Sequence, residues 1–175
     1  EIRNVPVLLV MNGIHPGEPD GIDASLLWAE WILSKNDSLL NHVCICIIPV
    51  YNIDGSFKRS CCSRANQDGP EYYGFRGNAK NLDLNRDFVK MDAKNTESFV
   101  KLFHWLQPDM FIDNHVSDGA DYQYTFTLLT TQKNKLEPGV GSYLYSFLLP
   151  EAELHMKNNG WPVAPYVNGF SEIPD

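Results

Sequence analysis

Short apolar runs alternate with a longer amphipathic stretch in the first 50 residues of the chain. Residues 5–11 and 43–50 are continuous apolar runs rich in β-branched side chains, which is typical of buried strands. Residues 20–34 between them predict a helix with Asp20 or Asp23 in its first turn. A strand, a helix and a strand in this order predict a βαβ unit with parallel strands.

The same alternation continues after residue 93. The apolar positions of residues 93–106 recur with the spacing of an amphipathic helix: Phe99, Leu102, Phe103 and Leu106. Pro108 ends this helix, and residues 109–113 ("DMFID") predict a third buried strand. The sequence then predicts a fourth strand over 122–130.

A further helix is predicted within 140–159, interrupted or restarted at Pro150 and ended by Asn159-Gly160. We see no internal repeat or linker. The order of the elements therefore predicts one α/β domain over residues 1–175, built as part of an α/β/α sandwich.

Residues 52–80 form a long polar connection rich in Gly, Ser and Asn, and a connection of this length inside a compact domain is usually functional. Cys61 and Cys62 lie in it, and because a disulfide between neighbours would be strained, we predict free thiols there. Cys44 and Cys46 alternate in an apolar run, which predicts buried thiols on one face of a strand.

The composition excludes some classes of partner. A net charge of −8 argues against a nucleic-acid or anionic-membrane surface, because such surfaces need clustered Lys and Arg. No apolar segment is long enough to span a bilayer. The sequence leaves the oligomeric state open.

Polar side chains follow each of the three buried strands where the strand ends: His15 and Glu18, then Asn52 and Asp54, then His115. Ligands of open α/β sheets gather outside the carboxyl ends of the strands. We therefore expect a functional site at this edge of the sheet.

The segment His15-Pro16-Gly17-Glu18 has the residue preferences of a type II turn, which brings the first and last Cα atoms within ~7 Å. Taken alone, it is more often a surface turn with two solvated side chains. A catalytic zinc needs three protein ligands and an open position, and two histidines with one glutamate are a known set. His115 is the natural third ligand, although it could instead be a rim histidine that is hydrogen-bonded by Asp113 or Ser117.

Residues 75–88 ("FRGNAKNLDLNRDF") contain groups that suit an anion. Leu82 and Leu84 alternate with polar residues, which predicts a short extended segment with its polar side chains on one side. Arg86 has a planar fork that can bind a carboxylate, Asn85 adds a donor, and Arg76 is a second guanidinium. The alternative interpretation is that Arg76 and Arg86 are solvated loop residues that bind no substrate.

Four segments together resemble the zinc carboxypeptidases of the M14 family, in the same order. They are "HPGE", "PVYNIDG", "RGNAKNLDLNRDF" and "FIDNHVS", and they cover residues 5 to about 117. The resemblance implies a zinc-exopeptidase-like α/β/α sandwich with a mixed, largely parallel sheet. It also favours a secreted or extracytoplasmic location.

The resemblance also implies roles for individual residues. His15, Glu18 and His115 would bind one zinc ion, and Arg76 would polarise the scissile carbonyl and stabilise the oxyanion. Asn85 and Arg86 would hold the free carboxylate of a peptide or acyl-amino-acid substrate. The implied activity is hydrolysis of the C-terminal peptide bond by a zinc-activated water.

Two departures from the family pattern matter. Asp87 stands where the family often has Asn, next to Arg86. The family's general base is a glutamate well beyond the second histidine, and none of the later glutamates has the family context: Glu137, Glu151, Glu153 and Glu172. We therefore expect the chain to end before that base, to be incomplete at its C-terminal side, and to turn over poorly by itself.

Three other functions share parts of this pattern. A zinc deacylase of the succinylglutamate desuccinylase/aspartoacylase type has the same H-x-x-E pair and also binds carboxylates. A non-haem iron oxygenase uses two histidines and one carboxylate, but in an H-x-[DE] arrangement on an all-β barrel. A non-catalytic peptide-binding module is the third alternative. The 52–80 connection and the "LNRDF" ending favour the peptidase.

Overall fold

The computed structural model describes residues 5–35, 38–64, 69–117 and 122–166. The contacts divide the chain into two compact units, Glu1–Ala120 and Asp121–Asp175, and each is described by itself. Among the described residues, no helix has both the length and the apolar character needed to cross a bilayer.

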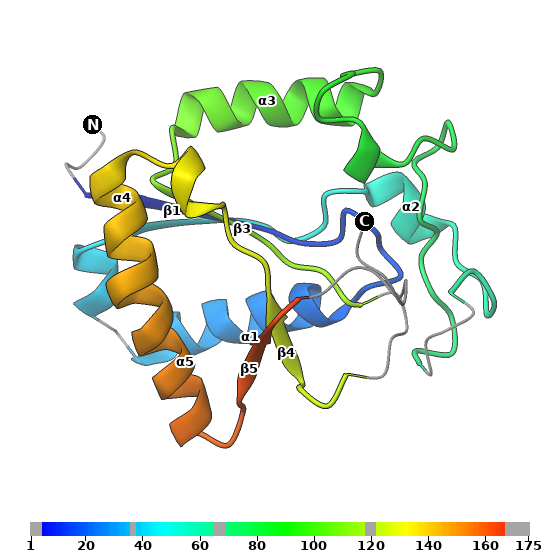
Figure 1. The fold of residues 1–175 in the computed structure, drawn as a ribbon. Coiled ribbons are helices and arrows are strands. Elements are labelled where there is room, and N and C mark those ends of the chain that lie inside the picture. Colours follow the sequence, from blue (N-terminus) through cyan, green and yellow to red (C-terminus); the bar gives the residue numbers. More distant parts are fainter. Residues whose placement is uncertain (1–4, 36–37, 65–68, 118–121, 167–175) are drawn as a thin grey trace, which may run out of the picture. The chain divides into compact units, whose positions relative to one another are not determined.

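The first unit is built on a three-stranded parallel sheet in the order β2-β1-β3 (Figure 1). The strands are β1 (Val7–Met11), β2 (Cys44–Ile48) and β3 (Met110–Asp113). Helices α1 (Asp20–Lys35) and α3 (Lys94–Leu106) lie on opposite faces of this sheet (Figure 1). The predicted βαβ unit, the third strand and both helices are therefore confirmed, within one or two residues at their ends.

The core lies between the sheet and α3. Successive side chains of a strand point to opposite faces, and Leu9 and Met11 of β1 are fully buried in the cluster that also contains Phe99. The ring of Phe99 lies edge-on to Tyr51, with ring centroids 5.5 Å apart, and 5.7 Å from Phe111. The amphipathic spacing in the sequence thus identified the face of α3 that packs on the sheet.

One buried amide joins the carboxyl ends of the strands. Asn12 follows β1, and its Nδ2 donates to Ser25 Oγ of α1 at 2.9 Å and to Ile48 O of β2 at 3.2 Å. Its Oδ1 accepts from Asn114 Nδ2, just after β3, at 2.7 Å. A Cβ atom on Gly21 would lie 2.5 Å from Asn114 Cβ, so the close approach of α1 requires glycine there. This network fixes the edge of the sheet at which the candidate site lies.

The long connection after β2 contains more structure than the sequence predicts. It holds a short helix α2 (Ile53–Phe57), capped by the Asn52 side chain, and a β-bridge between Ser60 and Tyr73. The predicted extended segment around Leu82 continues only to Asp83. The Asp83 side chain accepts from the N–H of Asn85 and begins the 3₁₀ turn η2 (Leu84–Arg86), so the prediction for 84–85 is wrong.

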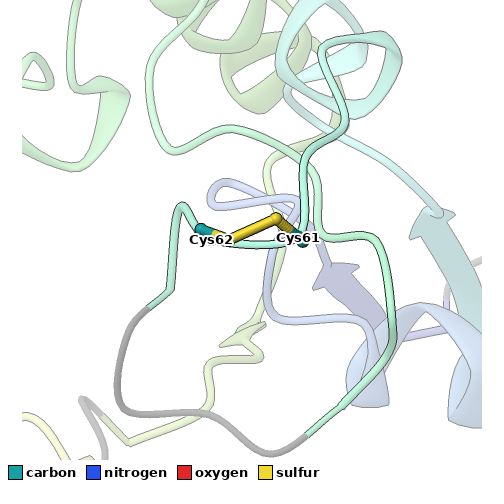
Figure 2. Close-up of a disulfide and its surroundings, with 2 residues drawn as sticks. All are labelled: Cys61 and Cys62. Atoms are coloured by element: carbon teal, nitrogen blue, oxygen red, sulfur yellow. A yellow bond between two sulfur atoms is a disulfide. The ribbon is translucent and has the colours of Figure 1, made fainter.

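Two predictions about cysteines are corrected. Cys44 and Cys46 do share a face, with their Sγ atoms 4.0 Å apart, but Cys44 is exposed and Cys46 only half-buried, because β2 is an edge strand of the described sheet. Cys61 and Cys62 form a disulfide rather than free thiols (Figure 2). The two Cα atoms lie 3.8 Å apart, and the side chains bond through their sulfur atoms within this span.

The second unit has a two-stranded parallel sheet of β4 (Phe126–Leu128) and β5 (Val163–Pro165). Between the strands, α4 (Pro138–Tyr143), the π-helical turn η4 (Leu144–Leu148) and α5 (Leu149–Asn158) follow one another. The helix predicted over 140–159 is confirmed, and its interruption is the π turn just before Pro150. The strand predicted over 122–130 is shorter than expected. A 3₁₀ turn, η3 (Lys133–Lys135), precedes α4, and the first unit contains a further 3₁₀ turn, η1 (Ser38–Asn41).

Candidate metal centre

The corner after β1 carries two buried polar side chains. The N–H of Glu18 donates to His15 O at 2.9 Å, which closes the predicted tight turn. His15 is 2% exposed and Glu18 is 3% exposed. They are therefore not the solvated side chains of a surface turn. His15 Nδ1 lies 3.1 Å from Glu18 Oε1, so the corner aims an imidazole and a carboxylate at one point.

His115 reaches the same point from β3. Its Nδ1 lies 3.0 Å from Glu18 Oε2, and the two imidazole rings meet edge to face. One ligand atom from each of His15, Glu18 and His115 lies within 4.8 Å of the other two. The His115 side chain is 33% exposed, so the cluster opens to solvent on its side. Two nitrogens and one carboxylate with an open side fit a catalytic zinc.

Each imidazole is also held by a second carboxylate. His15 Nε2 lies 3.0 Å from Asp83 Oδ1, and His115 Nε2 lies 3.1 Å from Asp113 Oδ2. A histidine that binds a metal through one ring nitrogen usually gives its other N–H to such an acceptor, which fixes the ring and its tautomer. In the neutral form of each ring, with Nε2–H donated, Nδ1 has a lone pair for a cation, so a metal would displace any proton held there. The Asp113 bond expected for a rim histidine is thus present and fits a ligand role as well.

The charges of the site follow from these bonds. Burial alone would raise the pKa of Glu18, but hydrogen bonds from His115, His15 and the N–H of Val116 hold the pKa far below its ordinary range. Burial alone would lower the pKa of His115, but the hydrogen bonds to Asp113 and Glu18 raise it to about 10. Burial would likewise raise the pKa of Asp83, and its bonds from His15 and Arg76 lower it. All the carboxylates with lowered pKa values are therefore ionised near neutral pH.

The predicted arginines are placed differently from each other. Arg76 is half-buried, and its Nε donates to Asp83 Oδ2 at 2.9 Å, so it joins the centre through the aspartate behind His15. Asn85 is half-buried and follows Asp83 in η2. Arg86 is exposed, and its Nη1 donates to Asn85 O at 2.9 Å. The structure thus brings Arg76 to the centre and leaves the fork of Arg86 in solvent.

The polar pair after β2 has a structural role. Asn52 is fully buried, and its Nδ2 donates to Ile14 O at 3.3 Å and to Arg76 O at 3.1 Å. Asp54 Oδ2 accepts from the N–H of Ala79 at 3.3 Å. These two side chains hold the 75–80 segment against the end of β1, so they position the centre rather than belong to it.

Sequence reasoning missed one residue of the centre. Arg64 Nη2 lies 2.9 Å from Glu18 Oε1, and the Arg64 side chain is only 8% exposed. An arginine in a polar loop gives no signal that distinguishes it from a solvated one. Asp83 carried a weak signal, because it lies on the polar side of the "LDLN" segment.

The later glutamates have ordinary positions where they are described. Glu137 caps α4, and its side chain accepts from the N–H groups of Gly139 and Val140. Glu151 and Glu153 are exposed on α5. Glu172 lies outside the described residues. The expectation that the general base lies beyond the chain stays a prediction.

Comparison with known proteins gives the same family by independent routes. The family model described as zinc carboxypeptidase, Peptidase_M14, matches residues 1–105. Probable carboxypeptidase 2 of Arthroderma benhamiae is 32% identical over 110 residues, which are 61% of this chain and 18% of that protein. Carboxypeptidase 2 of Trichophyton tonsurans is 31% identical over 110 residues with the same coverage.

The fold agrees with this match. A metallo-carboxypeptidase from Burkholderia cenocepacia superposes with a TM-score of 0.52 at 23% identity, over 70% of this chain and 32% of that chain. The family match ends before His115, so the placement of the third ligand rests on the structure. From its sequence match and its α/β fold, the chain belongs to the M14 family of zinc carboxypeptidases.

Proposed function

We propose that this chain carries the metal-binding part of a metallocarboxypeptidase that hydrolyses the C-terminal bond of peptides. The observation that carries the proposal is the convergence of His15, Glu18 and His115 within 4.8 Å, with a carboxylate behind each imidazole. These residues would hold one zinc ion. The relatives' name, carboxypeptidase, supports a peptide substrate with a free carboxylate, and we propose a secreted or extracytoplasmic location.

Zinc in such a site lowers the pKa of a bound water to about 7 and polarises a carbonyl group. The side chains around it have separate tasks. Asp83 and Asp113 keep the imidazole rings oriented, and Arg76, held by Asp83, would donate to the oxyanion that develops on the scissile carbonyl. Asn85 and the exposed fork of Arg86 would bind the terminal carboxylate of the substrate. We assign the role of general base to none of the described glutamates of the second unit, Glu137, Glu151 and Glu153.

Metal analysis of the purified chain tests the centre. We expect about one zinc per chain by mass spectrometry, and we expect His15→Ala to lose it because a ligand and its hydrogen bond to Asp83 are removed. His104→Ala is the matched control, since His104 is exposed on α3. A chain without zinc, or a His15→Ala variant that keeps it, would contradict the proposal. A finding of iron would reopen the oxygenase alternative, although the α/β fold differs from its all-β barrel.

Substrate assays on the complete protein separate peptidase from deacylase. We expect cleavage of peptides with a free C-terminus, little cleavage of the same peptides with a C-terminal amide, and a KM about 10- to 100-fold higher in Arg86→Gln, because a charged hydrogen bond to the carboxylate is lost. Lys58→Gln is a control that removes a cation stacked on Phe75. Cleavage of N-acyl amino acids alone would favour the deacylase, and binding without hydrolysis would favour a non-catalytic module.

A further inference from the structure

The loop that carries Arg64 is tied down next to the metal centre. Ser60 and Tyr73 exchange two main-chain hydrogen bonds of 2.8 and 3.0 Å, and Ser63 Oγ donates to Gly74 O at 3.4 Å. The Cys61–Cys62 disulfide lies between these two attachments (Figure 2). The main chain on the N-terminal side of Arg64 is thereby fixed, and the position of its side chain is not that of a free surface arginine.

The stem of Arg64 packs on the zinc-ligand corner. A Cβ atom on Gly17 would lie 2.8 Å from Arg64 Cγ and 3.2 Å from Arg64 Cδ. A Cβ atom on Gly74 would lie 2.5 Å from Pro16 Cβ, so this strand of the loop also lies directly on the corner. Both close approaches depend on glycine. The glycine inside "HPGE" therefore makes room for the arginine stem.

The guanidinium ends on the Glu18 carboxylate. Arg64 Nη2 lies 2.9 Å from Oε1, and the N–H of Val116 donates to Oε2 at 2.9 Å. Nδ1 of an imidazole that binds a metal cannot also donate a proton to Glu18. Arg64 and the Val116 N–H are then the donors that fix the plane of the carboxylate, one for each oxygen atom.

We propose that Arg64 is a positioning residue for Glu18, and that it sets the affinity and geometry of the metal centre; the inference rests on the proposed zinc site. Donors that hold a metal-binding carboxylate typically contribute 10- to 100-fold to metal affinity. Because Arg64 is buried, its bond to Glu18 is not weakened by competing water.

The charge of Arg64 acts in the opposite direction, because a cation beside Glu18 repels a divalent ion. Metal binding at Nδ1 requires both imidazoles to be neutral, and in that state the three carboxylates of Glu18, Asp83 and Asp113 and the two guanidinium groups of Arg64 and Arg76 carry a net charge of −1. The surroundings thus still attract a divalent cation with Arg64 in place. Replacing Arg64 should have two opposite effects on zinc affinity. We expect the loss of affinity from a poorly oriented Glu18 carboxylate to exceed the gain from removing the repulsion between Arg64 and the zinc ion.

The test compares three variants of the chain for metal binding, without an activity assay. Arg64→Met keeps the length of the stem and removes the donors, Arg64→Lys restores one charged donor, and Arg59→Met removes an exposed arginine of the same loop that bonds Tyr72 O. Zinc affinity is measured by competition with a chromophoric chelator, and the geometry by the visible absorption of the Co²⁺-substituted protein.

We expect Arg64→Met to weaken zinc binding by about 10- to 100-fold and to change the Co²⁺ spectrum. Arg64→Lys should recover part of both, and Arg59→Met should match the unmodified chain. Equal or tighter zinc binding by Arg64→Met with an unchanged spectrum would overturn the inference.

Failure of the unmodified chain to bind zinc would instead overturn the proposed function, and with it this inference. Circular dichroism and the denaturation midpoint check that the variants fold. If Arg64→Met does not fold, Arg64→Gln takes its place, because it keeps a polar side chain in the same space.

Discussion

At the scale of single residues, Asp83 serves three partners. Its oxygens accept from His15 Nε2, Arg76 Nε and the N–H of Asn85. It therefore links a predicted zinc ligand, the predicted oxyanion donor and the turn that contains the residues predicted to bind the substrate carboxylate. The sequence placed His15 and Arg76 in one site through motif order, but it could not show that one aspartate joins them, because that contact spans 68 residues.

Asp83→Asn should weaken zinc binding by about 10- to 100-fold, because an amide is a poorer acceptor for the His15 ring and leaves Arg76 without its charged partner. Zinc competition titration measures the effect. Asp92→Asn is the matched control, since Asp92 is exposed and pairs only with Lys90 among its described ion pairs. Unchanged affinity in Asp83→Asn would show that the aspartate does not orient the ligand.

Asp87 has a role that the family pattern did not suggest. It is almost fully buried, and its two oxygens accept from the N–H groups of Asp92 and Ala93. Burial alone would raise the pKa of this carboxyl, but its hydrogen bonds and the charge of Lys90 hold the pKa below the ordinary 3.8. Asp87, where the family often has Asn, thus stabilises the turn over residues 87–93 by accepting two main-chain hydrogen bonds.

Asp87→Asn should lower the free energy of unfolding by about 1–3 kcal/mol at pH 7, because an amide offers one acceptor oxygen to two N–H donors. The folded-state pKa lies below the unfolded one, so the stabilisation by the carboxylate is fully present above pH 3.8 and is lost as the pH falls through the folded-state pKa. Urea denaturation at pH 7 and at pH 3 measures the free energy of unfolding of variant and parent. The difference between the two proteins should be smaller at pH 3 than at pH 7. A constant difference would contradict this explanation.

At the scale of elements, α3 shows why some patterns predict well. Its stripe repeats over several turns, and the residues of that stripe contact the sheet. The strand predicted over 122–130 was too long because β4 extends only as far as its partner β5, which the sequence did not reveal. Leu128 pairs with Pro165, and proline has no N–H with which to continue a ladder. A strand's length depends on its partner, which a local pattern does not contain.

Phe99→Ala should lower the free energy of unfolding by about 3–5 kcal/mol, because it leaves a cavity between Tyr51, Phe111 and the rest of the aromatic cluster. Trp105→Ala on the same helix removes a larger side chain that is 73% exposed, and it should change stability by only about 0.5 kcal/mol. Chemical denaturation measures both. Similar losses in the two variants would mean that the cluster around Phe99 is not the core of the unit.

At the scale of the whole molecule, the candidate ligands all belong to the first compact unit. Sequence patterns predicted the parallel pairing of β1 and β2 and the existence of β3, and the family motifs led us to predict His15, Glu18 and His115 as metal ligands. They could not give Arg64 or the Cys61–Cys62 disulfide, because both depend on how a loop without a repeating pattern folds back. The predicted metal ligands follow strands β1 and β3, whereas Arg64 lies in the connection after β2.

Zinc should stabilise the protein, because an ion that binds only the folded state shifts the folding equilibrium. At a free zinc concentration 100 times Kd, the gain is about 2.7 kcal/mol. We expect a higher melting temperature with zinc, its reversal by a chelator, and no zinc effect in His115→Ala. His42→Ala, an exposed histidine before β2, should respond like the parent. A zinc-induced rise that persists in His115→Ala would place the ion elsewhere.

The pairing of β3 with β1 also determines when the centre can form during synthesis. His15 and Glu18 are neighbours in the chain, whereas His115 lies 97 residues beyond Glu18 and arrives only when Met110–Asp113 dock beside Leu8–Met11. A growing chain whose β3 is still inside the ribosome would present only two of the proposed ligands and would bind metal weakly. If the proposed zinc site is correct, the ion would bind tightly only after the sheet has assembled, and it would then connect residues that follow β1 and β3, the first and last described strands of this unit.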